Sequence, residues 1–159
     1  VGKVAYVGDA NNVWRSLAIG CSMLDIETSI ASPAGHQPIE VDLDRILSSG
    51  GSVQVTDDPH EAVEGADVVY TDVWTSMGQE DEKSERLDAF TSFTVDAALM
   101  EGANANSVFM HCLPAHRGEE VTNEVIEGPQ SRVFLQAHNR MHSARGLLSW
   151  ISGEASKND

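Results

Sequence analysis

Short apolar runs alternate with segments of helical periodicity along this chain. Runs rich in β-branched and aromatic residues, bounded by Gly, Pro, Asp and Ser, predict strands, and apolar residues spaced three or four apart predict helices. The predicted strands are 4–7, 26–31, 53–55, 66–71 and 107–111, with 133–135 as a small additional strand. The predicted helices are 12–24, 42–47, one opened by Asp58 and Pro59, 86–90, 94–101, one opened by Thr122, and a terminal helix from 136 or 137 to 151.

Strands that are apolar on both faces and separated by helices indicate a parallel sheet covered on both sides. We therefore predict an α/β fold, a doubly wound, Rossmann-like sheet of about five strands in a three-layer αβα arrangement. One domain is expected over 1–151, followed by a polar tail at 152–159. In such folds ligands bind beyond the carboxyl ends of the strands, near the point where strand order reverses.

The charge balance of the amino-acid composition excludes some classes of binding partner. The 159 residues hold 10 Lys and Arg against 25 Asp and Glu, a formal charge of −15. This balance argues against nucleic acid and anionic membranes as partners, since both demand a basic face.

Two cysteines, Cys21 and Cys112, make no disulfide framework, and no Cys-x-x-Cys or His-Glu-x-x-His spacing suggests zinc, so we expect no metal and no cofactor. The chain opens on Val-Gly-Lys without a signal peptide, and we interpret it as a cytoplasmic piece of a longer protein.

The first predicted strand ends in the polar sequence Gly8-Asp9-Ala10-Asn11-Asn12. The segment lacks the Gly-x-Gly-x-x-Gly pattern of dinucleotide sites. Asn11 and Asn12 instead lie at a helix N-terminus, where the dipole favours a carboxylate. One of the two could equally be only the helix cap, and the sequence leaves these alternatives open.

Two further strand ends carry reactive side chains. Asp72, after the fourth strand, is placed to bind an ammonium group, and Ser76 and Met77 could contact the polar and aliphatic parts of a substrate. Core packing is the simpler interpretation of Met77. All three strand ends are predicted to converge on one pocket.

The fifth strand ends in His111-Cys112-Leu113-Pro114. Successive strand residues point to opposite faces, so a His111–Cys112 catalytic pair is disfavoured. Cys112 is better suited to contact an amine, with simple packing as the alternative. Pro114 is expected to turn the Leu113 carbonyl toward the pocket, with a cis bond as one way to do so.

Together these loops resemble one family, ornithine carbamoyltransferase. The resemblance is carried by Gly8-Asp9-Ala10-Asn11-Asn12, Asp72-Val73-Trp74-Thr75-Ser76-Met77-Gly78-Gln79-Glu80, His111-Cys112-Leu113-Pro114 and Asn139-Arg140, in the order of the family. It covers nearly the whole chain and matches only the second, ornithine-binding domain of a two-domain enzyme. The Ser-x-Arg-Thr phosphate loop of the first domain does not occur here.

The resemblance implies a role for each matching residue. Asn12 and Asp72 hold the α-carboxylate and α-amino ends of L-ornithine, Ser76 and Met77 belong to a closing loop, and Cys112 and Leu113 face the reacting groups. Arg140 reaches carbamoyl phosphate. Asp72, Cys112 and Arg140 are thus the expected catalytic residues. His138, where the family usually has an acid, departs from the pattern.

The function implied is transfer of a carbamoyl group from carbamoyl phosphate to L-ornithine, giving L-citrulline and phosphate in arginine biosynthesis. The implied partners are these two substrates, the absent N-terminal domain and a homotrimer of the complete enzyme. The isolated chain is expected to be inactive. Two alternatives stay open: a carbamoyltransferase for putrescine or an acylated ornithine, and a non-catalytic small-molecule-binding module.

Overall fold

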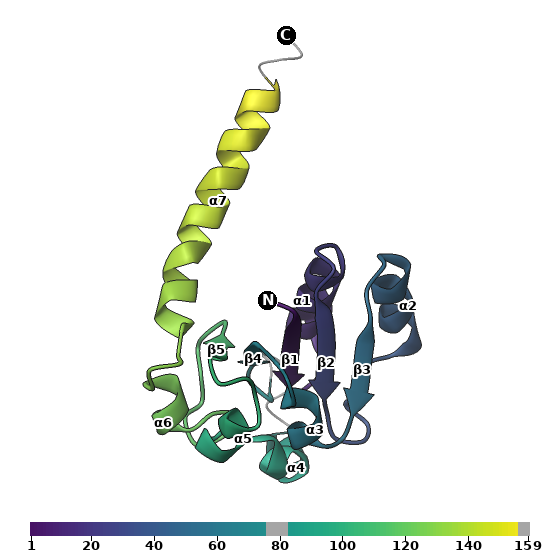
Figure 1. Ribbon diagram of the computed structural model, residues 1–159, viewed down its shortest axis with the longest axis vertical. Helices are drawn as coiled ribbons and strands as arrows, with labels where there is room; N and C mark the ends of the chain where they lie inside the picture. The colour runs from purple at the N-terminus through teal and green to yellow at the C-terminus, as the bar shows by residue number, and fades with distance from the viewer. Residues whose placement is uncertain (76–82, 156–159) are drawn as a thin grey trace.

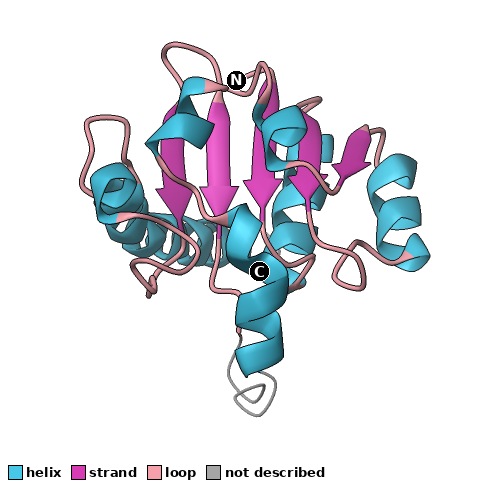
Figure 2. Cartoon of the chain, turned by 90° about the horizontal axis from the view of Figure 1, so that it is seen from below, coloured by secondary structure: helices cyan, strands magenta, loops and turns pink. Residues whose placement is uncertain are grey.

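A parallel sheet forms the centre of the molecule in the computed structural model, which describes residues 1–75 and 83–155 (Figure 1). Its strands are β1 (Lys3–Val7), β2 (Glu27–Ala31), β3 (Val53–Thr56), β4 (Val68–Thr71) and β5 (Val108–His111). They lie in the order β3-β2-β1-β4-β5, and every pairing is parallel. All arrows accordingly point the same way in Figure 2. The predicted fold class is confirmed.

Helices connect the strands. They are α1 (Asn12–Ser22), α2 (Glu40–Ser48), α3 (Pro59–Val63), α4 (Lys83–Phe90), α5 (Ala97–Glu101), α6 (Asn123–Ile126) and α7 (Val133–Ala155), with a 3-10 turn η2 (Thr91–Phe93) after α4. Asp58 and Thr122 cap α3 and α6 through their side chains, as predicted. Asp96 caps α5, which is shorter than the predicted helix 94–101.

The two faces of the sheet carry separate hydrophobic cores, because neighbouring strand residues point to opposite sides. One face packs Tyr6, Ile30 and Tyr70 with Trp14 of α1 and Ile46 of α2. The other core is formed by alternate residues of the same strands with α3, α5 and α6, and its members include Ala5, Val7, Ala31, Val63, Val69, Leu99, Phe109 and Ile126. This is the predicted three-layer arrangement.

The predicted strand at 133–135 is wrong, because these residues form the first turn of α7. Val133 is fully buried while Phe134 and Leu135 are exposed, which is a helical pattern of burial. Ser131, just before this helix, makes an isolated parallel bridge to Phe109. The helix also continues beyond 151 to Ala155, so the first part of the predicted polar tail is helical, and 156–159 lie outside the described residues.

Within the described residues, helix α7 is anchored to the sheet near its start and then extends away from it (Figure 1). Gln136 provides the anchor: its Nε2 donates to the Tyr70 hydroxyl at 2.8 Å, and its Oε1 accepts from the His111 amide at 3.1 Å. Along the rest of α7, large apolar side chains are exposed, namely Met141, Leu147, Leu148, Trp150 and Ile151. None of the helices within the described residues is long and apolar enough to cross a membrane.

Candidate functional site

Strand order reverses between β1 and β4. The chain runs outward from β1 to β2 and β3, then returns to place β4 on the other side of β1 and β5 beyond it. The carboxyl ends of β1, β4 and β5 are therefore neighbours, and the loops that follow them flank the crevice where this fold binds ligands. These are the three strand ends singled out in the sequence.

The turn after β1 depends on Gly8, whose φ of +142° lies in a region that side chains disfavour. Its amide donates to the Ala31 carbonyl at 2.9 Å, and its own carbonyl accepts from the Ser32 hydroxyl. The turn leads directly to Asn11, the N-cap of α1. The Asn11 Oδ1 accepts from the amides of Val13 and Trp14 at 2.9 and 3.2 Å. Of the two asparagines, Asn11 is thus the cap, and Asn12 begins the helix with an exposed side chain.

Asp72 lies at the centre of the three loops, 7% exposed. Its Oδ2 accepts from the Asn11 Nδ2 at 3.2 Å, and its Oδ1 accepts from the Cys112 Sγ at 3.0 Å. One carboxylate therefore joins the loops after β1, β4 and β5. The convergence expected from the sequence is confirmed for Asp72 and Cys112, and Asn11 is the asparagine that touches them.

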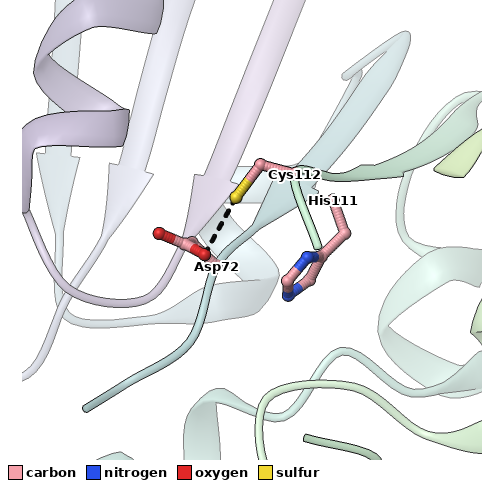
Figure 3. A group of neighbouring side chains, drawn as sticks. All are labelled: Asp72, His111 and Cys112. Carbon is pink, nitrogen blue, oxygen red and sulfur yellow. Dashed lines mark hydrogen bonds between the residues drawn. The ribbon is translucent and has the colours of Figure 1, made fainter. Parts of the chain in front are cut away.

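The environment of Cys112 favours the protonated thiol. Burial comes first, and the hydrogen bond and negative charge of Asp72 add to it; together they raise the pKa of Cys112 from 9.0 to about 12. A thiol with this pKa carries almost no thiolate at neutral pH, so Cys112 is unsuited to nucleophilic attack and suited to polar contact. Figure 3 shows its sulfur directed at Asp72.

His111 is turned toward a different partner. Its Nε2 lies 3.2 Å from the Oε1 of Glu120, both side chains being fully buried, and its Nδ1 accepts from the Leu113 amide at 2.8 Å. This agrees with the prediction that His111 and Cys112 do not form a catalytic pair (Figure 3). Leu113 has a φ of +58° and precedes a cis bond to Pro114. His111 therefore braces an unusual backbone conformation next to the site.

Two buried tyrosines lie next to the site. Tyr6 and Tyr70 are directly paired across β1 and β4, and their rings stack with centroids 5.9 Å apart. The Tyr6 hydroxyl donates to the Asn11 Oδ1 at 3.4 Å. Burial and the neighbouring acids raise the pKa of Tyr6 well above its usual value, and burial chiefly raises that of Tyr70 to about 12. The sequence patterns did not single out this pair, although one tyrosine in each of two predicted strands is a usable signal.

A second polar group, which the sequence patterns also did not single out, contacts Asp9 in the loop after β1. Arg86 of α4 is 5% exposed; its Nε donates to the Trp74 carbonyl at 2.6 Å and its Nη2 to Asp9. His36 joins them, with its Nδ1 3.7 Å from the Asp9 Oδ1. This buried arginine connects α4 to the loops after β1 and β4.

The other predicted site residues are Ser76, Met77 and Arg140. Ser76 and Met77 fall outside the described residues. Arg140 is exposed on α7, beyond the anchored first turn of that helix, and no hydrogen bond or ion pair within the described residues joins it to Asp72. Figure 1 shows that α7 extends away from the sheet. Two groups of side chains have metal-ligand chemistry, with ligand atoms within 4.8 Å of one another. One is Asp72, His111 and Cys112; the other is His116, Glu119 and Glu120, in the turn after Pro114.

Comparison with known proteins identifies the family of this chain. Residues 2–151 match the family model of the aspartate/ornithine carbamoyltransferase Asp/Orn binding domain. The ornithine carbamoyltransferase of Bacillus subtilis is 53% identical over 98% of this chain and 51% of its own length.

Solved structures give the same result. The ornithine carbamoyltransferase from Pyrococcus furiosus superimposes with a TM-score of 0.86 at 47% identity, over 93% of this chain and 49% of that one. The anabolic enzyme from Campylobacter jejuni gives 0.90 at 34% identity, over 96% and 52%. The chain thus spans about half the length of the relatives it matches. By sequence and by fold, it belongs to the aspartate/ornithine carbamoyltransferase family and carries the Asp/Orn binding domain of that family.

Proposed function

We propose that this chain is the ornithine-binding half of an ornithine carbamoyltransferase. The complete enzyme would transfer a carbamoyl group from carbamoyl phosphate to L-ornithine, giving L-citrulline and phosphate for arginine biosynthesis in the cytoplasm. The names of the relatives support the activity. The main structural support is the hydrogen-bonded Asp72–Cys112 pair, which lies at the carboxyl ends of β4 and β5, next to the point where strand order reverses.

Substrate binding follows from the charges at that point. The carboxylate of Asp72 is 7% exposed, and a positively charged α-amino group is the partner that would best compensate its charge. Asn12 begins α1 with an exposed amide, where the helix dipole favours the substrate's α-carboxylate. Ser76 and Met77 would close over the substrate. Asn11 is hydrogen-bonded to Asp72 and to the first turn of α1. It would therefore fix the distance between Asp72, which contacts the α-amino group, and Asn12, which contacts the α-carboxylate.

In the reaction, the δ-nitrogen of ornithine forms a bond to the carbonyl carbon of carbamoyl phosphate. The bond from that carbon to the phosphate oxygen breaks, phosphate leaves, and the attacking nitrogen loses a proton. The amine must be neutral to attack, and a site that excludes water favours the neutral form. The Cys112 thiol and the Leu113 carbonyl would contact the reacting groups, without a covalent intermediate on sulfur.

The carbamoyl phosphate contacts would come largely from the other half of the enzyme. Helix α7 supports this division, because it leaves the sheet and exposes a series of large apolar side chains that a partner domain would cover. Arg140 lies on the same helix and would reach carbamoyl phosphate once that domain is in place. The complete enzyme is proposed to be a homotrimer, as the resemblance to ornithine carbamoyltransferases implies.

The proposed contacts can be tested on the chain itself by NMR. We expect millimolar L-ornithine to shift the amide signals of Asn11, Asn12, Asp72, Cys112 and Leu113, and Asp72→Asn to abolish the shifts. Putrescine and L-aspartate serve as competing ligands. Equal shifts with putrescine would favour an enzyme for a simpler amine. Shifts grouped elsewhere, or none with any ligand, would contradict the assignment of ornithine binding to these residues.

A further inference from the structure

The turn after Pro114 brings together one imidazole and two carboxylates that the proposed reaction does not use. The His116 Nδ1 lies 3.6 Å from the Glu119 Oε2 and 3.9 Å from the Glu120 Oε2. The ligand atoms of all three side chains lie within 4.8 Å of one another.

Two carboxylate oxygens, the Oε2 atoms of Glu119 and Glu120, face His116 and are buried without a hydrogen-bond partner among residues 1–75 and 83–155. Glu120 is completely buried, and only its Oε1 is satisfied, by the His116 amide at 2.6 Å and by the His111 Nε2 at 3.2 Å. Its Oε2 and the Oε2 of Glu119 accept no hydrogen bond from the part of the chain that the structure describes. A buried oxygen left unpaired in this way costs about 1–3 kcal/mol, so the arrangement calls for a further partner.

His116 alone does not supply that partner, because separations of 3.6 and 3.9 Å are too long for hydrogen bonds. These two separations are short enough for a metal ion shared between His116 and each carboxylate. Bonds of about 2.1 Å to nitrogen and oxygen allow two ligands of one ion to lie up to about 4.2 Å apart. The side chains of His116 and Glu119 are 45% and 25% exposed and so have room to close on an ion. Lys83, 3.3 Å from the Glu119 Oε1, already pairs with the other oxygen of that carboxylate.

We propose that His116, Glu119 and Glu120 bind one divalent transition-metal ion. Two carboxylate oxygens and one imidazole nitrogen suit a hard or borderline ion such as Mn²⁺ or Zn²⁺. The ion would be structural and linked to the candidate active site, because the satisfied oxygen of Glu120 holds His111, and His111 holds the Leu113 amide. This site is separate from the Asp72–Cys112 pair and does not depend on the proposed function.

The test is an EPR titration of the chain with Mn²⁺, in which binding removes the signal of the free ion. Mn²⁺ is chosen because it has little affinity for the thiol of Cys112. The double variant His138→Ala, His142→Ala serves as the background, since these exposed side chains have their Nε2 atoms 3.1 Å apart on α7 and could chelate by themselves.

We expect one Mn²⁺ per chain, with His116→Ala and Glu119→Gln each weakening binding at least about tenfold. Glu124→Gln, an exposed acid on α6 outside the cluster, is the matched control and should leave binding unchanged. Circular dichroism verifies that each variant is folded. Absence of stoichiometric binding, or equal loss in Glu124→Gln and Glu119→Gln, would overturn the proposal.

Discussion

Asp72 and Cys112 face each other across the carboxyl ends of β4 and β5, with the Cys112 Sγ donating to the Asp72 Oδ1 at 3.0 Å. The contact joins residues 40 positions apart in sequence. It keeps the thiol protonated and one carboxylate oxygen engaged, while the second oxygen is held by Asn11. The centre of the site is therefore a hydrogen-bonded acid and thiol rather than a nucleophilic cysteine.

This pairing predicts slow alkylation of Cys112. With its pKa raised to about 12, the thiol should react with iodoacetamide at pH 8 at least about tenfold more slowly than a free cysteine. The rate should keep rising from pH 8 to pH 11, because the thiolate fraction grows up to the raised pKa. Peptide-resolved mass spectrometry separates Cys112 from Cys21.

Asp72→Asn is the control for that experiment. Removing the negative charge lowers the pKa of Cys112, so the variant should be alkylated faster than the unmodified chain at the same pH. An unchanged rate in Asp72→Asn would mean that Asp72 does not govern the thiol.

Replacing each of the two adjacent asparagines should affect a different property: Asn11 the stability of the fold, and Asn12 the binding of ornithine. Asn11→Ala removes the cap of α1 and the bond to Asp72, which should lower the free energy of unfolding by about 1–2 kcal/mol in urea titration. Asn12→Ala should change it by less than about 0.5 kcal/mol because its side chain is exposed. Asn12→Ala should nevertheless weaken ornithine binding. Equal destabilisation by both changes would contradict this division.

The buried pair of His111 and Glu120 should matter for stability. Glu120→Ala leaves the His111 Nε2 and the His116 amide without their acceptor in a site with no exposure, and should destabilise the fold by about 3 kcal/mol. Thermal unfolding measures the change. Glu124→Ala, at an exposed position, is the comparison, and similar melting temperatures for the two variants would be inconsistent with the role given to Glu120.

Arg86 should not be replaceable by lysine. Its Nε and Nη2 reach two different acceptors, the Trp74 carbonyl and Asp9, and an ammonium group cannot reproduce this fork. Arg86→Lys should therefore lower stability by about 2 kcal/mol, whereas Arg45→Lys on the exposed side of α2 should not. Full retention of stability in Arg86→Lys, measured by urea unfolding, would show that the fork is dispensable.

Much of the fold was predictable because its signals are local. The apolar strands, the alternation of strands and helices, and the caps Asp58 and Thr122 all follow from residues within a few positions of one another. The proximity of Asp72 and Cys112 was also predictable from the sequence, because the carboxyl ends of parallel strands meet at one edge of the sheet.

What could not be predicted depends on distant contacts. Asn11 and Asn12 offer the same chemistry in sequence, and only the orientation of α1 decides which one caps it. Arg86 meets Asp9 across 77 positions. The residues 133–135 have strand propensity, but burial of Val133 on one side favours a helix, because tertiary packing overrides local preference.

Citrulline formation by a chimeric enzyme would show whether this chain can supply the ornithine-binding half of an active carbamoyltransferase. In a chimera, this chain replaces the matching half of the Bacillus subtilis enzyme, to which it is 53% identical. We predict citrulline production from carbamoyl phosphate and L-ornithine within about tenfold of the parent rate, a difference of about 1.4 kcal/mol in the barrier. Asp72→Asn should abolish it. A folded chimera that makes no citrulline, or that carbamoylates putrescine in preference to ornithine, would contradict the account.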